Sequence, residues 1–94
     1  MARRIATALV RRRLAACVNC LAGMESTFPW KGKIDQCREV LLIIKTTPGR
    51  FAQLTRAVIR LHPYEVPEVI ALPVTAGAAP YLRWVAQSVS ADRP

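Results

Sequence analysis

The 94-residue sequence has no long hydrophobic run. Its longest aliphatic stretch, residues 40–44, is bounded by Glu39 and Lys45, whereas a membrane-spanning helix needs about 20 consecutive apolar residues. The sequence therefore predicts a soluble chain with no membrane partner. Arginines at positions 11–13 interrupt what would be the apolar region of a secretion signal. Without an export signal, the cytoplasm is the expected location.

The sequence has three cysteines, an odd number, at Cys17, Cys20 and Cys37. An odd count without an export signal favours free thiols in a reducing compartment. Cys17 and Cys20 have C-x-x-C spacing, but a zinc ribbon needs a second such pair, and a redox motif needs its first cysteine at a helix N-terminus. On an extended strand the two side chains point to opposite faces. Both are predicted to be buried and inert.

Acidic residues are few: six Asp and Glu stand against 14 Lys and Arg, giving a net charge of +8. In the first predicted helix, Arg4 and Arg11 lie opposite the apolar side formed by Ile5 and Leu9. The arginine-bearing face of this helix is interpreted as solvated, with an anionic partner as the alternative. The sequence has neither a helix-turn-helix pattern nor an RNA-binding aromatic strand. No specific nucleic acid is therefore expected as a partner.

Catalytic patterns are absent as well. The chain has one histidine, no G-x-S-x-G sequence and no phosphate-binding glycine loop. Because no nucleophile and base can be paired, the sequence predicts a protein that is not an enzyme.

The sequence does contain the pattern of one α+β domain spanning residues 1–94. Hydrophobic periodicity and turn residues predict helix, strand, strand, helix, strand and helix, in that order. Lys31 and Gly32 are predicted to form the hairpin turn. Thr47 and Pro48 are predicted to start the second long helix. The predicted elements are a helix over 2–16, strands over 17–30 and 33–47, a helix over 48–61, a strand over 67–74 and a helix opening at Pro80.

Both faces of the second strand are apolar, since Val40, Leu42 and Ile44 alternate with Leu41 and Ile43. In a domain this small, helices can cover only one face of the sheet. The uncovered face predicts an oligomer.

The densest group of functional side chains follows the second long helix. His62, Glu65 and Glu68 supply one imidazole and two carboxylates, which suit copper or another divalent metal. Pro63 and Pro67 exclude a helix there, so convergence needs a folded-back loop or a second subunit. From the residues alone, a capping and turn role is the favoured alternative.

A ligand cleft is a second candidate site. Trp30, Tyr64, Tyr81 and Trp84 could line it, although aromatic side chains in so small a core more often serve packing or interfaces. Lys45 ends an apolar strand, where it could pair with Glu65 or Glu68, hold an anionic ligand or extend its ammonium group into water.

Five segments together resemble the CutA divalent-cation-tolerance family and cover essentially the whole chain. They are RRLAACVN at 12–19, WKGKI at 30–34, EVLLIIKT at 39–46, HPYEVPEVIALPV at 62–74 and YLRWV at 81–85. The resemblance implies a ferredoxin-like sandwich, similar to PII signalling proteins, assembled as a homotrimer. It also implies copper or other divalent-metal tolerance without catalysis, with His62 matching a proposed copper ligand.

The sequence departs from the family at its N-terminus, because it starts inside the first helix. The central first strand, which carries the family's proposed cysteine ligand, is therefore expected to be missing. The alternative function is a PII-like trimeric signalling or scaffold protein that binds a small anionic ligand or a protein partner between subunits.

Overall fold

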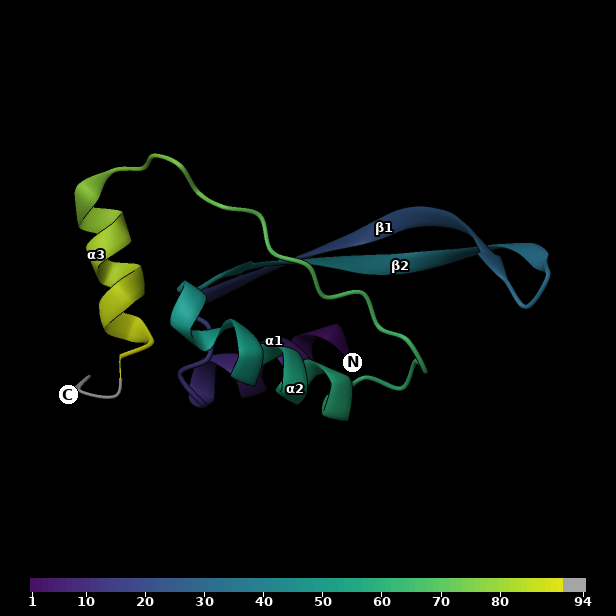
Figure 1. The fold of residues 1–94 in the computed structure, drawn as a ribbon, viewed down its shortest axis with the longest axis horizontal. Helices are drawn as coiled ribbons and strands as arrows, with labels where there is room; N and C mark the ends of the chain where they lie inside the picture. The colour runs from purple at the N-terminus through teal and green to yellow at the C-terminus, as the bar shows by residue number, and fades with distance from the viewer. Residues whose placement is uncertain (91–94) are drawn as a thin grey trace.

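A long β-hairpin, with two helices packed against its base, forms most of the molecule (Figure 1). The computed structural model describes residues 1–90. Among them, no helix is both long enough and apolar enough to cross a membrane. The elements, in chain order, are α1 (Ala2–Arg11), β1 (Cys17–Trp30), β2 (Lys33–Lys45), the 3₁₀ helix η1 (Pro48–Arg50), α2 (Phe51–Leu61) and α3 (Ala79–Ser88).

The hairpin turn confirms the prediction at Lys31 and Gly32. Both residues have positive φ, 49° and 81°, as a two-residue turn of type I′ requires. The strands pair antiparallel from Trp30 opposite Lys33 down to Cys17 opposite Lys45. The register shifts between Leu21 and Met24, where Gly23 also has a positive φ of 85°. Glycines therefore occupy both the turn and the bulge of the hairpin.

Replacing Gly32 with alanine is expected to destabilise the fold by about 1 kcal/mol, because a Cβ atom strains a residue at this φ. Urea denaturation followed by circular dichroism measures the change. Gly49→Ala is the matched control, because an added Cβ meets no atom within 4 Å at either glycine, but Gly49 does not have a positive φ. Equal destabilisation by the two substitutions would contradict the role assigned to the Gly32 backbone.

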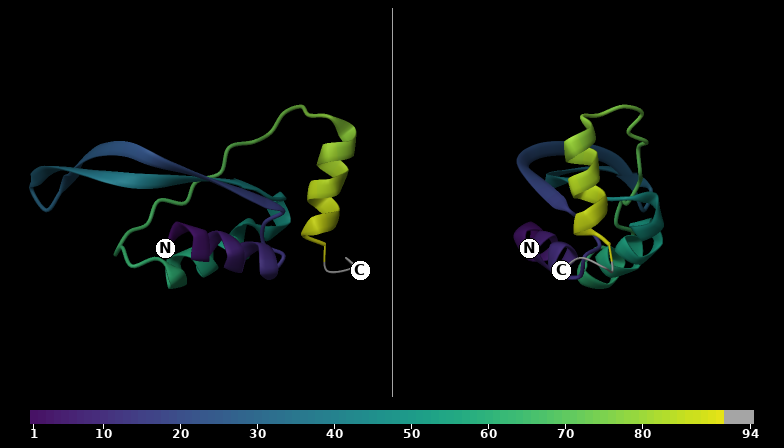
Figure 2. Two further views of the ribbon diagram at one scale, coloured as in Figure 1. Left: turned by 180° about the vertical axis from the view of Figure 1, so that it is seen from behind. Right: turned by 90° about the vertical axis from the view of Figure 1, so that its left-hand side faces the viewer.

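The core lies between the hairpin base and the helices α1 and α2, which share one face of the sheet (Figure 2). Leu9 is fully buried and Leu54 is 2% exposed. Leu42 and Ile44 of β2 pack against this cluster, as their alternation predicts. On the other face, Leu41 and Ile43 remain 40% and 48% exposed, so one apolar face of the sheet is uncovered in the single chain.

The strand predicted over residues 67–74 is wrong: residues 67–78 have no regular secondary structure. The segment runs extended from α2 to α3 (Figure 1), but no backbone hydrogen bond joins residues 63–77 to other described backbone. A strand needs a neighbour, and the described sheet contains only β1 and β2. Pro67 and Pro73 also lack the N–H group that a ladder requires.

The helix ends also correct the sequence analysis. The first helix ends at Arg11 rather than at residue 16, and Arg13 has a φ of 58°, which a helix cannot continue. Thr47 does precede the second helical segment, but its side chain makes no capping hydrogen bond. That segment starts as η1 and continues as α2.

The last helix, α3, packs at the end of the sheet away from the hairpin tip (Figure 2). Pro80 lies in its first turn, as predicted. Val85 and Val89 form a small second cluster with Ala16. Arg50 Nε donates a hydrogen bond of 2.8 Å to the carbonyl oxygen of Val89, which joins the end of α3 to η1.

Candidate metal and ligand site

The loop after α2 holds the histidine in a defined position. His62 is the C-cap residue of α2, and its N–H group donates to the Val58 carbonyl oxygen at 2.8 Å. Its Nδ1 atom accepts a 3.1 Å hydrogen bond from the Tyr64 N–H. The rings of His62 and Tyr64 meet edge to face, with centroids 4.4 Å apart. The capping and turn role is therefore present in the structure.

The Tyr64 ring also shares its surroundings with the hairpin. Partial desolvation raises the pKa of Tyr64, and the negative charges available at Cys37 and Glu39 raise it further. The pKa of the Cys37 thiol is raised too, first by desolvation and then by Glu39 and Asp35. Sequence reasoning missed this group, because Cys37 and Tyr64 are 27 positions apart and no local pattern connects them.

Substituting Glu39 with glutamine is expected to speed the alkylation of Cys37 by a maleimide. Removing the carboxylate lowers the raised pKa of the thiol, so more reactive thiolate is present at neutral pH. Peptide mapping by mass spectrometry measures the rate at each cysteine. Glu25→Gln removes the same charge from β1 and should leave the Cys37 rate unchanged. An unchanged rate in Glu39→Gln would contradict the assigned cause.

The two predicted carboxylate ligands, Glu65 and Glu68, are exposed on the segment that follows. Within residues 1–90, no group of three or more His, Cys, Asp and Glu side chains is placed to hold a metal ion. The single chain therefore does not bring His62, Glu65 and Glu68 together as a ligand set. Their role in metal binding stays a prediction.

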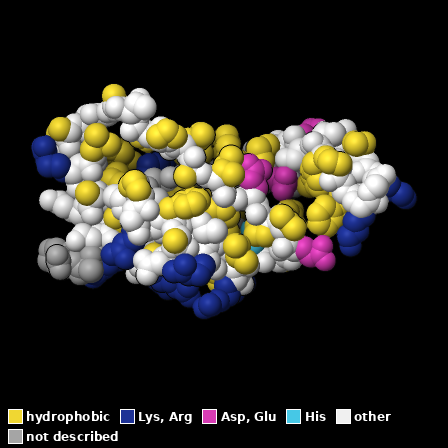
Figure 3. Space-filling model, in the orientation of Figure 1, with side chains coloured by type: hydrophobic (Ala, Val, Ile, Leu, Met, Phe, Trp, Pro, Cys, Tyr) yellow, Lys and Arg dark blue, Asp and Glu magenta, His cyan; other side chains and the backbone are white. Residues whose placement is uncertain are grey.

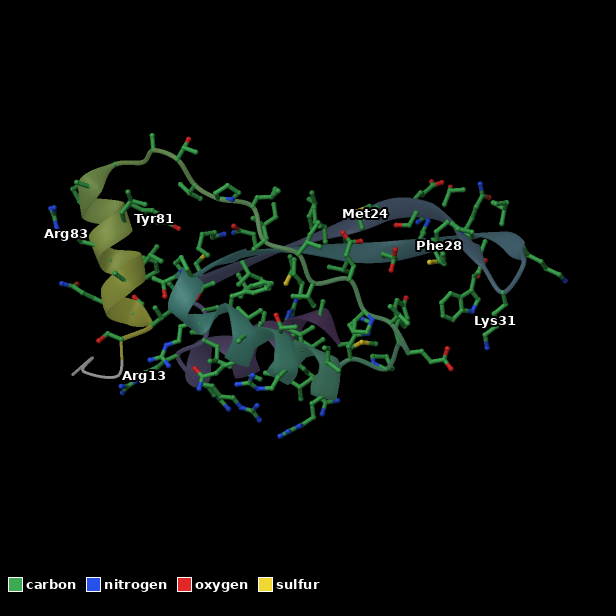
Figure 4. The ribbon with its side chains drawn as sticks, in the orientation of Figure 1. Arg13, Met24, Phe28, Lys31, Tyr81 and Arg83 are labelled. Atoms are coloured by element: carbon green, nitrogen blue, oxygen red, sulfur yellow. The ribbon has the colours of Figure 1, made fainter. Side chains whose placement is uncertain are left out.

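The predicted cleft residues lie on separate elements, since Trp30 ends β1 and Trp84 lies on α3. Figure 4 shows how far apart these elements are, with Lys31 labelled at the hairpin tip and Tyr81 on α3. Trp30 lies at the hairpin tip, where the Lys31 ammonium group is 5.6 Å from its ring centroid. It lines an open hollow of about 400 Å³ with Lys33, Ile34 and Asp35. Trp84 lies on α3, with its ring 5.8 Å from that of Tyr81. One chain alone does not assemble these residues into a cleft.

The side chain of Lys45, another predicted cleft residue, makes its hydrogen bonds within the hairpin, to one residue of β1 and one of β2. Its Nζ atom donates to Asn19 Oδ1 and, at 3.2 Å, to the Ile43 carbonyl oxygen. The ammonium group lies on the sheet face that carries Ile43, since Asn19 and Ile43 are cross-strand partners. Lys45 therefore lies beside the uncovered apolar face.

Comparison with known proteins decides the family. The family model described as "CutA1 divalent ion tolerance protein" matches residues 1–88. This chain belongs to the CutA1 family. It is 53% identical to mouse Protein CutA over 87 residues, which are 93% of this chain and 49% of the mouse protein. It is 47% identical to the divalent-cation tolerance protein CutA of Thermus thermophilus over 94% of this chain and 85% of that protein.

Solved CutA structures share the fold, which confirms the α+β, ferredoxin-like assignment. The CutA structure from Xylella fastidiosa aligns with a TM-score of 0.92 at 40% identity, covering 95% of this chain and 86% of that chain. The rice CutA1 structure aligns with a TM-score of 0.92 at 43% identity, covering 97% and 84%. This CutA1 chain spans about half the length of its mouse and human relatives.

The thiols of this CutA1 chain correct one prediction. All three cysteines are free, as expected, but Cys20 is exposed and Cys17 is only partly covered. The sequence analysis predicted both to be buried. Cys20 lies on β1 opposite Leu42, and its side chain is left uncovered in the single chain.

Proposed function

We propose that this CutA1 protein is a divalent-metal-responsive homotrimer that binds copper and has no catalytic activity. Its membership of the CutA1 family carries this proposal, since the matching family model covers residues 1–88. The exposed loop that begins at His62 supplies the first donor. Glu65 and Glu68 are the carboxylates nearest to it in sequence.

The donor set of one chain limits how a metal could bind. The chain has a single histidine, and the described residues form no group of three metal-binding side chains. A specific divalent site needs several such donors. The proposed copper site therefore takes donors from more than one copy, which makes metal binding depend on the trimer.

The hydrogen bond to His62 adds a second constraint. Because Nδ1 accepts from the Tyr64 N–H, the neutral ring carries its proton on Nε2. A metal binds a deprotonated imidazole nitrogen. Binding at Nδ1 displaces the Tyr64 N–H directly, and binding at Nε2 moves the proton to Nδ1 with the same result. The cost is that of one hydrogen bond, about 1 kcal/mol, so His62 can still serve as a ligand.

Native mass spectrometry with and without Cu(II) tests the proposal, because it reports subunit number and metal stoichiometry together. A trimer that gains up to one copper per chain is expected, and His62→Ala should abolish the gain. The experiment is repeated after Cys17, Cys20 and Cys37 are replaced by serine, since free thiols also bind copper.

Carboxylate variants provide the matched control. Glu65→Gln with Glu68→Gln should weaken copper binding, while Glu25→Gln with Asp35→Asn removes the same charge from the hairpin and should leave it unchanged. A trimer that binds no copper, or that binds it equally well in His62→Ala, would contradict the metal proposal.

A further inference from the structure

The net charge of the chain is concentrated in its two packed helices. Residues 1–16 and 47–62, which contain α1, η1 and α2, hold eight arginines and no acidic residue. The rest of the sequence has six Lys and Arg and six Asp and Glu, which cancel. The whole of the +8 charge therefore belongs to the helical layer.

Four of these arginines point away from the core and are termed here the arginine row: Arg4, Arg11, Arg56 and Arg60. All four are exposed. At 3.6 residues per turn, they lie opposite the buried Leu9 on α1 and the buried Leu54 and Val58 on α2. Figure 3 shows Lys and Arg side chains gathered along the lower edge of the molecule, over these helices.

We propose that the arginine row binds the phosphate backbone of double-stranded nucleic acid without sequence preference. Arg4 and Arg11 are about 10 Å apart along α1, and Arg56 and Arg60 about 6 Å apart along α2. Each strand of a duplex places a phosphate about every 3.4 Å of helix axis and winds obliquely around that axis, so the two arginines of each pair can reach separate phosphates. Arginine also presents a fork of N–H donors that matches phosphate oxygens.

The same helices are poorly suited to a membrane surface. A helix that binds a bilayer inserts an apolar face, but Ile5, Leu9 and Leu54 are at most 3% exposed in the protein's own core. Ile59, 53% exposed, is one of the few large apolar side chains left outward on α2. The helical layer therefore offers charge without the apolar face that membrane insertion requires.

Single-stranded nucleic acid is the less suitable polyanion. Proteins that bind single strands stack bases on exposed aromatic side chains. Phe51 is the one aromatic residue of α1 and α2, and it is half-buried. Contacts from this layer are thus limited to the backbone, which a duplex presents at regular spacing. The proposal depends on neither the metal site nor the trimer.

Fluorescence anisotropy with a labelled duplex DNA of arbitrary sequence, titrated at several salt concentrations, tests this proposal. Four phosphate contacts predict a slope of about −3.6 for log Kobs against log[salt], so Kobs should fall on the order of 100-fold for a fourfold rise in salt. Replacing all four residues of the arginine row with glutamine should remove most of that slope. Glutamine is a good helix former, so the fold should be retained.

The matched control replaces Lys31, Lys33, Arg38 and Arg83 with glutamine, which removes the same charge from exposed positions outside α1 and α2. This variant should keep the wild-type slope. If circular dichroism shows that the fourfold variant is misfolded, Arg4→Gln with Arg11→Gln and Arg56→Gln with Arg60→Gln are tested separately, and each should lose about half the slope.

Three results would overturn the proposal. They are no binding to duplex at low salt, equal loss of slope in the row and control variants, and binding to phosphatidylserine vesicles without binding to duplex. The last result would assign the layer to a lipid surface, and vesicle binding should then also fall in Ile59→Asn. Tighter binding to a thymidine 30-mer than to the duplex would contradict the choice of double-stranded nucleic acid.

Discussion

Replacing Leu9 with alanine is expected to destabilise the fold by about 2–5 kcal/mol, the largest stability effect of any single substitution proposed for this chain. Leu9 has no exposed surface and lies in the cluster that joins α1 to α2 and the hairpin base. Its removal loses buried apolar contacts and leaves a cavity. Since a small domain is stable by only about 5–15 kcal/mol, this substitution could remove a large share of the total.

Chemical denaturation of the wild-type and variant proteins measures this effect through the transition midpoint. Ile59→Ala is the matched control, because it also truncates a large aliphatic side chain on a helix, but one that is 53% exposed. A change within about 0.5 kcal/mol is expected there. If Leu9→Ala cost no more than Ile59→Ala, the core described for α1 and α2 would be wrong.

Features set by neighbouring residues could be predicted from the sequence. The turn at Lys31 and Gly32 needs only two residues that tolerate positive φ, and it forms where predicted. The alternation along β2 likewise separates Leu42, which packs on the core, from Ile43, which is exposed. In both cases the local pattern and the tertiary structure require the same conformation.

Features that depend on a distant partner could not be predicted. The segment 67–74 has the residues of a strand, but a strand forms only beside a neighbour, and the described sheet supplies none on that side. The position of Tyr64 near Cys37 and Glu39 likewise arises from a loop that returns to the hairpin. Hydrophobic periodicity contains no information about such a contact.

The predicted site residues show the same division. His62 was predicted to cap and turn the chain, and it does so through its hydrogen bond with Tyr64. The metal site and the ligand cleft were predicted from residue types alone, and one chain separates their members: Trp30 lies at the hairpin tip and Trp84 on α3. The proposed metal site and the predicted ligand cleft therefore both depend on a second copy of the chain, and hence on the uncovered face of the sheet.

Placing lysines at Leu41 and Ile43 is expected to convert the proposed trimer into monomers. With Leu21, the cross-strand partner of Leu41, these residues form the uncovered apolar face of the hairpin base, and the three side chains are 40–59% exposed in the single chain. A subunit contact that buries this face would have to bury two ammonium groups, and a buried charge without a partner costs several kcal/mol. Sedimentation velocity at micromolar concentration measures the change.

Ile59→Lys is the control for this substitution, because it also adds a charge at an exposed isoleucine, but on α2 and away from the sheet. It should leave the trimer intact. Circular dichroism should show the same secondary structure for both variants, since neither replaces a core residue. If the protein with lysine at both positions is still a trimer, this face is not the contact between subunits. That result would also remove the physical ground for a copper site shared between copies, because the exposed sheet face is the feature that calls for a partner subunit.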